Sequence, residues 1–199
     1  MPYGYTGQNL INQTVKNSGV FSISDVADLE KQGKFGGSLE HISTTTFSSV
    51  ANVDITSGFI GYDVFLMQID NVSGSTNMNF RFQFYESGTL ETGGVYQFAK
   101  QFGQPDGGFG ESRSTTASSV PIFSMNSNPA SSYVYLYNFT DSSKYSFATF
   151  HSMSTYSGDP EFQFGGFVLP QASTVDGVRL LTSTGTASGE INLYGVKQI

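Results

Sequence analysis

Apolar and polar residues alternate along much of the chain from residue 38 onward. In residues 79–86, phenylalanines at positions 80, 82 and 84 alternate with Arg, Gln and Tyr. Successive side chains of a strand point to opposite faces of a sheet, so this pattern predicts a strand with one buried face. Similar alternation predicts strands at residues 62–69, 133–138, 145–151, 161–168, 178–181 and 191–196, and shorter patterns predict strands at 39–47, 53–55, 95–99 and 120–123.

Turn-rich segments separate these predicted strands. They contain mainly Gly, Ser, Asn, Asp, Thr and Pro and lie at residues 71–77, 87–94, 103–110, 126–132, 157–160 and 182–189. Many short strands with no helix between them indicate two packed antiparallel sheets. We therefore predict an all-β fold, an antiparallel β-sandwich of jelly-roll type. Sequence spacing alone leaves an immunoglobulin-like sandwich and a closed barrel open as alternatives.

Residues 1–37 lack the alternating pattern found from residue 38 onward. This difference predicts an N-terminal arm at residues 1–37 ahead of a sandwich domain at residues 38–199. Ser24 or Asp25 caps a predicted short helix in which Val26 and Leu29 share one face. An isolated helix of this length is marginal in water. We therefore expect Val26, Leu29 and Phe35 to dock on the sandwich or on a neighbouring protein, as the anchor of the arm.

The composition argues against several kinds of partner and chemistry. Only nine Lys and Arg residues are present and the net charge is −7, so we expect no nucleic-acid partner. The sequence contains no apolar run long enough for a membrane span, so we expect no membrane insertion. Residues 1–8 lack the basic start and apolar stretch of a secretory signal, so we expect none. The absence of cysteine excludes a disulfide scaffold, a thiolate metal site and a cysteine nucleophile.

The residues that commonly carry catalysis or metal binding form no recognisable motif. The two histidines, His41 and His151, both fall within predicted strands, and no G-x-S-x-G motif precedes a helix. Asp106 and Asp159 lie in loops that could contribute calcium ligands, but neither loop resembles an EF-hand. We therefore predict a protein that is not an enzyme, with no catalytic residues, no cofactor and no metal site. A glycosidase with paired carboxylates stays as an alternative, because such acids need not be adjacent in sequence.

Three tyrosines stand on one face of a predicted strand. Tyr133, Tyr135 and Tyr137 alternate with Val134 and Leu136. A tyrosine stripe on an outer face can pack against another protein or stack on sugars, because the ring is apolar and its tip is polar. The alternative is that the three rings belong to the inner face of the sandwich. We name them as candidate contacts with a partner protein or a glycan.

Several segments resemble structural proteins of tailed bacteriophage particles, especially marine and cyanobacterial phages. They are residues 19–40 (GVFSISDVADLEKQGKFGGSLE), 62–72 (YDVFLMQIDNV), 164–180 (FGGFVLPQASTVDGVRL) and 191–197 (INLYGVK). This resemblance implies a virion protein of the tail fibre, the tail tip or the capsid decoration, often jelly-roll-like and commonly multimeric. It carries no catalytic residues. The sequence has no heptad stretch and no β-helical repeat, which favours a compact component over a shaft.

Together, the residues and the resemblance predict a non-enzymatic virion structural protein, located in the phage particle. Its expected partners are other virion proteins, further copies of itself in a homo-oligomer, with a trimer favoured, and a glycan of the host surface. A glycan-binding β-sandwich module is the alternative function. A glycan-active enzyme is the third and least favoured.

Overall fold

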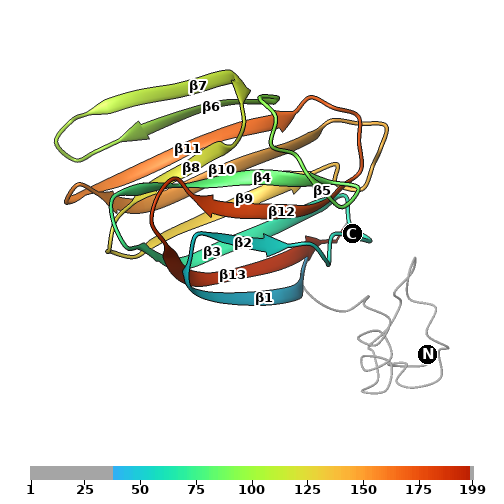
Figure 1. The fold of residues 1–199 in the computed structure, drawn as a ribbon, viewed down its shortest axis with the longest axis horizontal. Coiled ribbons are helices and arrows are strands. Elements are labelled where there is room, and N and C mark those ends of the chain that lie inside the picture. Colours follow the sequence, from blue (N-terminus) through green and yellow to red (C-terminus); the bar gives the residue numbers. More distant parts are fainter. Residues whose placement is uncertain (1–37, 198–199) are drawn as a thin grey trace, which may run out of the picture. The chain divides into compact units, whose positions relative to one another are not determined.

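The computed structural model describes residues 38–197, which form thirteen strands and no helix (Figure 1). The strands are β1 (Leu39–Val50), β2 (Asn52–Ile55), β3 (Val64–Gly74), β4 (Met78–Glu86), β5 (Thr89–Leu90), β6 (Tyr96–Gly103), β7 (Phe109–Ala117), β8 (Val120–Met125), β9 (Ala130–Tyr137), β10 (Ser146–Tyr156), β11 (Asp159–Leu169), β12 (Val175–Thr182) and β13 (Ala187–Val196). The predicted all-β class is therefore confirmed. The predicted arm, its short helix and its anchor residues Val26, Leu29 and Phe35 lie outside the described residues.

The strands form two antiparallel sheets. The larger sheet has eight strands in the order β1-β13-β3-β9-β10-β11-β6-β7. The smaller sheet has the order β2-β12-β4-β5, and β8 also pairs with β4. Every strand pairing within residues 38–197 is antiparallel, as the hydrophobic alternation predicts. In Figure 1 the smaller sheet lies in front of part of the larger one, and β6 and β7 extend past it.

The connectivity is that of a jelly roll with additions. The first strand pairs with the last, β13 pairs with β3, and β3 pairs with β9. In the other sheet, β2 pairs with β12, β12 with β4, and β4 with β8. These two sets of four strands are the two halves of a jelly roll. The remaining long strands, β6, β7, β10 and β11, widen one half into the eight-stranded sheet, so the predicted fold type is confirmed and extended.

Aromatic side chains fill the space between the sheets. The alternation in β4 places Phe80, Phe82 and Phe84 in the core, where each is 2% exposed or less. Phe84 contacts Phe139 and Phe167, with ring centroids 5.0 and 5.4 Å apart. Offset and edge-to-face aromatic pairs of this kind contribute to stability beyond their buried area. The core therefore explains part of the aromatic richness of the sequence, whereas other Phe and Tyr side chains are exposed.

Strands β5 and β7 were not predicted as strands. β7 consists mainly of Gly, Ser, Thr and charged residues, and its burial pattern shows no fully buried position. It pairs only with β6, at the edge of the eight-stranded sheet. An edge strand needs no apolar face, so its sequence lacks the alternation used for prediction. β5 is two residues long and falls in the turn-rich segment at residues 87–94.

Candidate functional site

The three predicted tyrosines lie on the outer face of the eight-stranded sheet. In β9 the inward-facing residues Val134 and Leu136 are fully buried, whereas Tyr133 is 43% exposed and Tyr135 and Tyr137 are half-buried. The rings of Tyr133 and Tyr135 are 6.1 Å apart and those of Tyr135 and Tyr137 are 6.4 Å apart. The inner-face alternative is therefore wrong, and the stripe points away from the core.

Neighbouring strands continue the tyrosine stripe into a row of rings across the sheet. Tyr133 of β9 is paired with His151 of β10, and His151 is paired with Phe164 of β11. The ring centroids are 5.2 Å apart in the first pair and 5.8 Å in the second. The amide side chains of Gln68 and Gln101 hold the next positions at the two ends of this row. This row of tilted rings therefore ends in hydrogen-bonding groups on both sides.

Further apolar side chains surround this row. Met153 is 57% exposed, Phe109 is 79% exposed, and the Phe109 ring lies 6.0 Å from that of Phe162. A hollow of about 710 Å³ is lined by the following residues of this face: Leu66, Gln68, Asp70, Ser131, Tyr133, Tyr135, His151, Met153, Phe162 and Phe164. We call the exposed surface of β3, β9, β10 and β11 that carries these residues the outer aromatic face.

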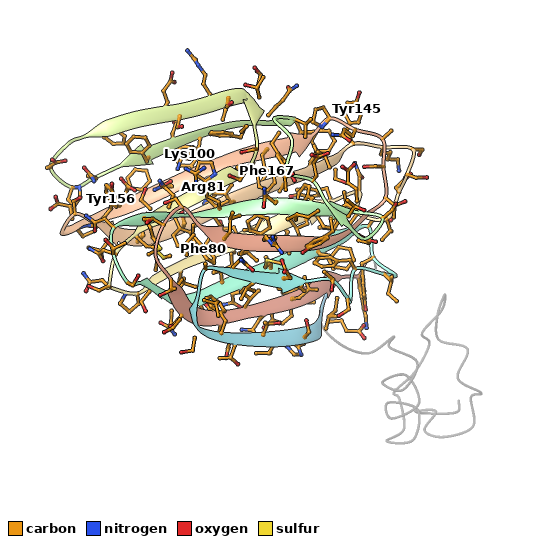
Figure 2. All side chains as sticks on the ribbon, in the orientation of Figure 1. Phe80, Arg81, Lys100, Tyr145, Tyr156 and Phe167 are labelled. Atoms are coloured by element: carbon orange, nitrogen blue, oxygen red, sulfur yellow. The ribbon has the colours of Figure 1, made fainter. Side chains whose placement is uncertain are left out.

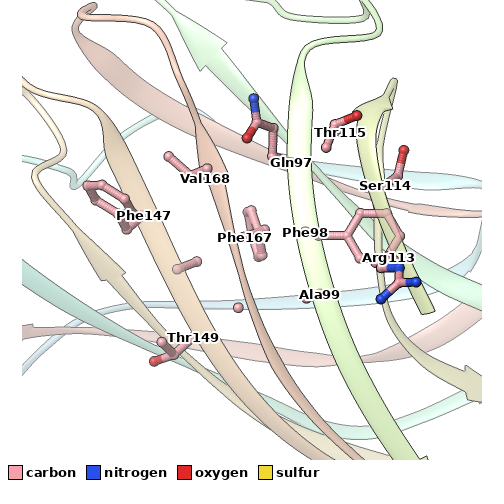
Figure 3. A pocket seen from close by; sticks show the side chains of 12 residues that line it. Gln97, Phe98, Ala99, Arg113, Ser114, Thr115, Phe147, Thr149, Phe167 and Val168 are labelled. Atoms are coloured by element: carbon pink, nitrogen blue, oxygen red, sulfur yellow. The ribbon is translucent and has the colours of Figure 1, made fainter. Parts of the chain in front are cut away.

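A second hollow, of about 690 Å³, lies on the same side of the sheet (Figure 3). It forms where Gly166 stands between Thr149 of β10 and Ala99 of β6, so that no side chain rises from the middle strand. Phe147, 43% exposed, and Val168 border it on one side and Gln97 and Arg113 on the other. The outer aromatic face is therefore bordered by a trough with an apolar side and a polar side.

A different cluster of polar side chains lies where β8, which pairs with β4 of the smaller sheet, packs against β10 and β11 of the larger sheet. Lys100 of β6 and Glu161 and Gln163 of β11 are 7%, 4% and 2% exposed. They line the same hollow of about 330 Å³ as Arg81 of β4 and Tyr156 of β10. Figure 2 labels Arg81, Lys100 and Tyr156. We call this hollow, lined by Asn79, Arg81, Lys100, Phe102, Ser112, Pro121, Ser124, Tyr156, Glu161 and Gln163, the corner cleft.

Hydrogen bonds connect the acidic and amide groups of the corner cleft. The Lys100 ammonium donates to Gln163 Oε1 at 2.5 Å. The amide nitrogen of Gln163 donates to Glu161 and to the Ser124 hydroxyl. Burial lowers the pKa of the Lys100 ammonium to about 8, with the nearby Glu161 carboxylate raising it and the Arg81 guanidinium lowering it. A buried cation with a displaced pKa is a common mark of a binding or catalytic site.

The corner cleft was not predicted from the sequence. Lys100 lies one residue beyond the strand predicted at residues 95–99, and Glu161 is the first residue of the strand predicted at 161–168. At a strand end, an outward and solvated charge is the usual interpretation. The available signal was the face of the strand on which each residue lies. Lys100 shares its face of β6 with the buried Tyr96, and Glu161 shares its face of β11 with the buried Phe167. A charged residue on the same face of a strand as core residues indicates a buried charge.

The structure does not bring the histidines together. His41 lies on β1, where its Nε2 is 2.9 Å from the Thr44 hydroxyl, whereas His151 lies on β10. Three strands, β13, β3 and β9, separate β1 from β10. His151 instead belongs to the outer aromatic face, packed between Tyr133 and Phe164.

One pair of carboxyl groups does meet, at the hairpin of β4 and β5. Glu86 and Glu91 are hydrogen-bonded to each other. Burial and the neighbouring Glu91 raise the pKa of Glu86, while the backbone N–H of Gly93 holds the pKa of Glu91 low. The two catalytic carboxyls of glycosidases stand farther apart, with room for the sugar and water between them. Direct contact between Glu86 and Glu91 therefore fits a shared proton and not a glycosidase pair.

The loops considered for calcium serve as turns in this fold. Asp106 accepts a hydrogen bond from the backbone N–H of Gly108 in the β6–β7 hairpin, at 3.0 Å. Asp159 is the first residue of β11. Within residues 38–197, no group of three or more His, Asp or Glu side chains is arranged to hold a metal ion.

No helix among the described residues has the length and apolar character to cross a membrane. No protein family, curated protein or solved structure matches this chain.

Proposed function

We propose that this chain is a non-enzymatic structural protein of a bacteriophage particle and that the outer aromatic face is its contact surface. Support comes from two sources. The sequence resembles virion structural proteins, and the jelly-roll sandwich exposes aromatic and apolar side chains together on one sheet. The observation that carries the proposal is the contiguous exposure of Tyr133, Phe164, Met153, Phe147 and Phe109.

Such a face is unusual for a protein that works alone. Soluble monomers rarely leave large apolar patches in water, and larger patches mark sites of interaction. Tyr, Phe and Met are enriched at protein contacts, whereas Lys, Glu and Asp are depleted. The outer aromatic face has this composition, and Asp70 is its one acid among the residues that line the 710 Å³ hollow.

The test uses phage particles assembled with either the wild-type chain or a variant. We expect the chain in purified particles, and we expect the triple change Tyr133→Ser, Tyr135→Ser and Tyr137→Ser to reduce its incorporation. Because these rings point outward, the melting temperature should change little. The matched control is Ile60→Ser with Tyr145→Ser, which removes two exposed apolar side chains elsewhere. Absence of the chain from particles, or equal incorporation of both variants, would contradict the proposal.

Glycan binding by the same face is the second candidate function. The specific observation in its favour is the aromatic row of Tyr133, His151 and Phe164 with Gln68 and Gln101 at its ends. Aromatic rings can stack on the apolar faces of sugars while amides bond the hydroxyls. The same triple variant tested on a glycan array separates the two candidates, since lost glycan binding with normal incorporation favours a host-contacting role.

A further inference from the structure

The corner cleft contains more hydrogen-bond donors than acceptors. An ammonium group has three N–H donors and a guanidinium group has five. Among the described residues, Lys100 donates to Gln163 and Arg81 donates to the Ser119 hydroxyl, at 3.2 Å. The Nε of Arg81 is buried and has no hydrogen-bond acceptor. Apart from this buried Nε–H, most of the donors of both cations have no acceptor among the described residues.

The one acid that lines the cleft is already engaged. One carboxylate oxygen of Glu161 accepts from Gln163 and the other accepts from Gln104. The two cations and this one carboxylate leave a single excess positive charge facing the hollow. Burying an uncompensated cation is costly unless a partner neutralises it. The charge balance therefore fits a ligand with one negative charge.

The remaining lining narrows the chemistry of that ligand. The rings of Phe102 and Tyr156 form an aromatic part of the wall, and Asn79, Ser112 and Ser124 provide amide and hydroxyl groups. Aromatic rings with neutral polar groups suit a sugar ring, and the cations suit a carboxylate. A phosphate dianion would bring a second negative charge close to Glu161.

The backbone is also shaped to bring these groups together. Gly165 of β11 is paired with Lys100 of β6, and a Cβ at position 165 would lie 2.4 Å from the Ala99 carbonyl and 2.7 Å from the Lys100 Cβ. Only glycine permits β6 to approach β11 so closely at this point. The cleft is thus built from a close strand contact that includes Lys100 itself.

We propose that the corner cleft is a binding site for a sugar acid, with its carboxylate between Lys100 and Arg81 and its ring beside Phe102 and Tyr156. A single uronic acid residue of an acidic polysaccharide has this chemistry. The site lies apart from the outer aromatic face and does not depend on the proposed function.

Isothermal titration of the full-length protein at pH 7 tests the site with four probes: glucuronate, glucose, acetate and phosphate. We expect glucuronate to bind more tightly than the other three, because it alone combines the sugar ring with one carboxylate. Lys100→Met and Arg81→Gln should each weaken glucuronate binding by about tenfold or more, as expected for a lost hydrogen bond to a charged group. Lys144→Met, which removes an exposed lysine paired with Asp141, is the matched control and should leave binding unchanged.

The pH dependence gives an independent readout. Glucuronate binding should weaken as the pH rises above about 8, because Lys100 then loses the proton that makes it a cation. The other charged and titratable groups that face the hollow are Glu161 on β11, Arg81 on β4 and Tyr156 on β10. Because Lys100→Met removes the ammonium group, the loss of affinity above about pH 8 should be absent in that variant. Three results would overturn the site: no glucuronate binding, equal binding of glucose, acetate or phosphate, or unchanged affinity in both cleft variants that fold normally. Because the titration needs no particle, its failure is distinguishable from failure of the virion proposal.

Discussion

The Tyr96 hydroxyl joins two parts of the backbone inside the core. It accepts a hydrogen bond from the backbone N–H of Phe84 at 2.7 Å and donates to the Glu91 carbonyl at 3.2 Å. Tyr96 is fully buried, and burial raises the pKa of its hydroxyl well above the ordinary value. The group therefore stays protonated and holds the β4–β5 hairpin against β6.

We expect Tyr96→Phe to lower the free energy of unfolding by about 1–3 kcal/mol, because the change leaves the buried Phe84 N–H without its acceptor. Chemical denaturation at pH 7 measures this loss. Tyr145→Phe removes the hydroxyl of a tyrosine that is 47% exposed and should have little effect. Equal stability of the Tyr96→Phe protein and the wild type would show that water replaces the hydroxyl.

Single residues also show what the sequence could and could not reveal about the candidate sites. Tyr133, Tyr135 and Tyr137 were found because their alternation with Val134 and Leu136 is visible within one strand. His151 and Phe164 complete the aromatic row, but their place beside Tyr133 depends on strand order, which spacing does not fix. Lys100 and Arg81 meet from different sheets, so the corner cleft depends on tertiary packing.

At the scale of an element, the short strand β2 relies on its neighbour β12. β2 has four residues and ends the smaller sheet. Asp54 of β2 forms a two-point ion pair with Arg179 of β12, with distances of 2.6 and 2.8 Å. Arg179 also donates to the Tyr85 hydroxyl at 3.1 Å and lies over its ring. This arrangement connects all three strands β2, β12 and β4 on the outer side of the smaller sheet.

We expect Asp54→Asn to lower the free energy of unfolding by roughly 1 kcal/mol at pH 7. This value is at the upper end of the range for partly exposed ion pairs, because the Asp54–Arg179 pair has two contacts. The Arg179 guanidinium lowers the pKa of Asp54 below its ordinary value of 3.8. The ionised carboxylate therefore stabilises the fold above about pH 4, and this stabilisation is lost as the pH falls through the lowered pKa. The difference in the free energy of unfolding between the wild type and Asp54→Asn should become smaller over that acidic range.

Denaturation curves at pH 7 and at several pH values below 4 check this expectation. Glu111→Gln is the control, since Glu111 and its partner Arg113 form a highly exposed pair on the edge strand β7. A difference between wild type and Asp54→Asn that stays constant with pH would mean that the ion pair is not its cause.

Element prediction succeeded for the long strands with one buried face and failed for the edge strand β7. β4, β9, β10, β11 and β13 alternate because one side meets the core. β7 is bordered by solvent at its free edge and carries Ser, Thr and charged residues without a buried apolar face. The first residues of β7 were assigned to the turn-rich segment at residues 103–110, because the local sequence gives no sign of pairing with β6.

At the scale of the molecule, the jelly roll depends on contacts between the two ends of the described sequence. Leu39 is paired with Val196, and the pairing of β1 with β13 continues to Val50 and Ala187. Such distant pairing leaves no local pattern, so the fold type was inferred from the number and spacing of strands. The widening of one sheet by β6, β7, β10 and β11 could not be inferred in that way, because a strand sequence does not state which sheet it joins.

The last prediction concerns assembly of the full chain. We expect the purified protein to be a homo-oligomer, with a trimer favoured, because the resemblance class is commonly multimeric and the sequence of residues 1–37 carries apolar positions on a polar background. Val26→Asp with Leu29→Asp should shift it toward the monomer, because burying an unpaired carboxylate in an apolar contact costs several kcal/mol or opens the contact. The melting temperature should stay close to the wild-type value, since the sheets of residues 38–197 pack a hydrophobic core of their own.

Light scattering at micromolar concentration measures the change, and a matched variant separates charge from apolar contact. Ser24→Asp with Lys31→Gln alters the net charge by the same amount as the double aspartate variant but keeps Val26 and Leu29. That control should remain oligomeric. If all three proteins have the same mass, the arm is not the anchor, and the outer aromatic face becomes the surface to test for self-association. A wild-type monomer that is also missing from particles would remove assembly as the function altogether.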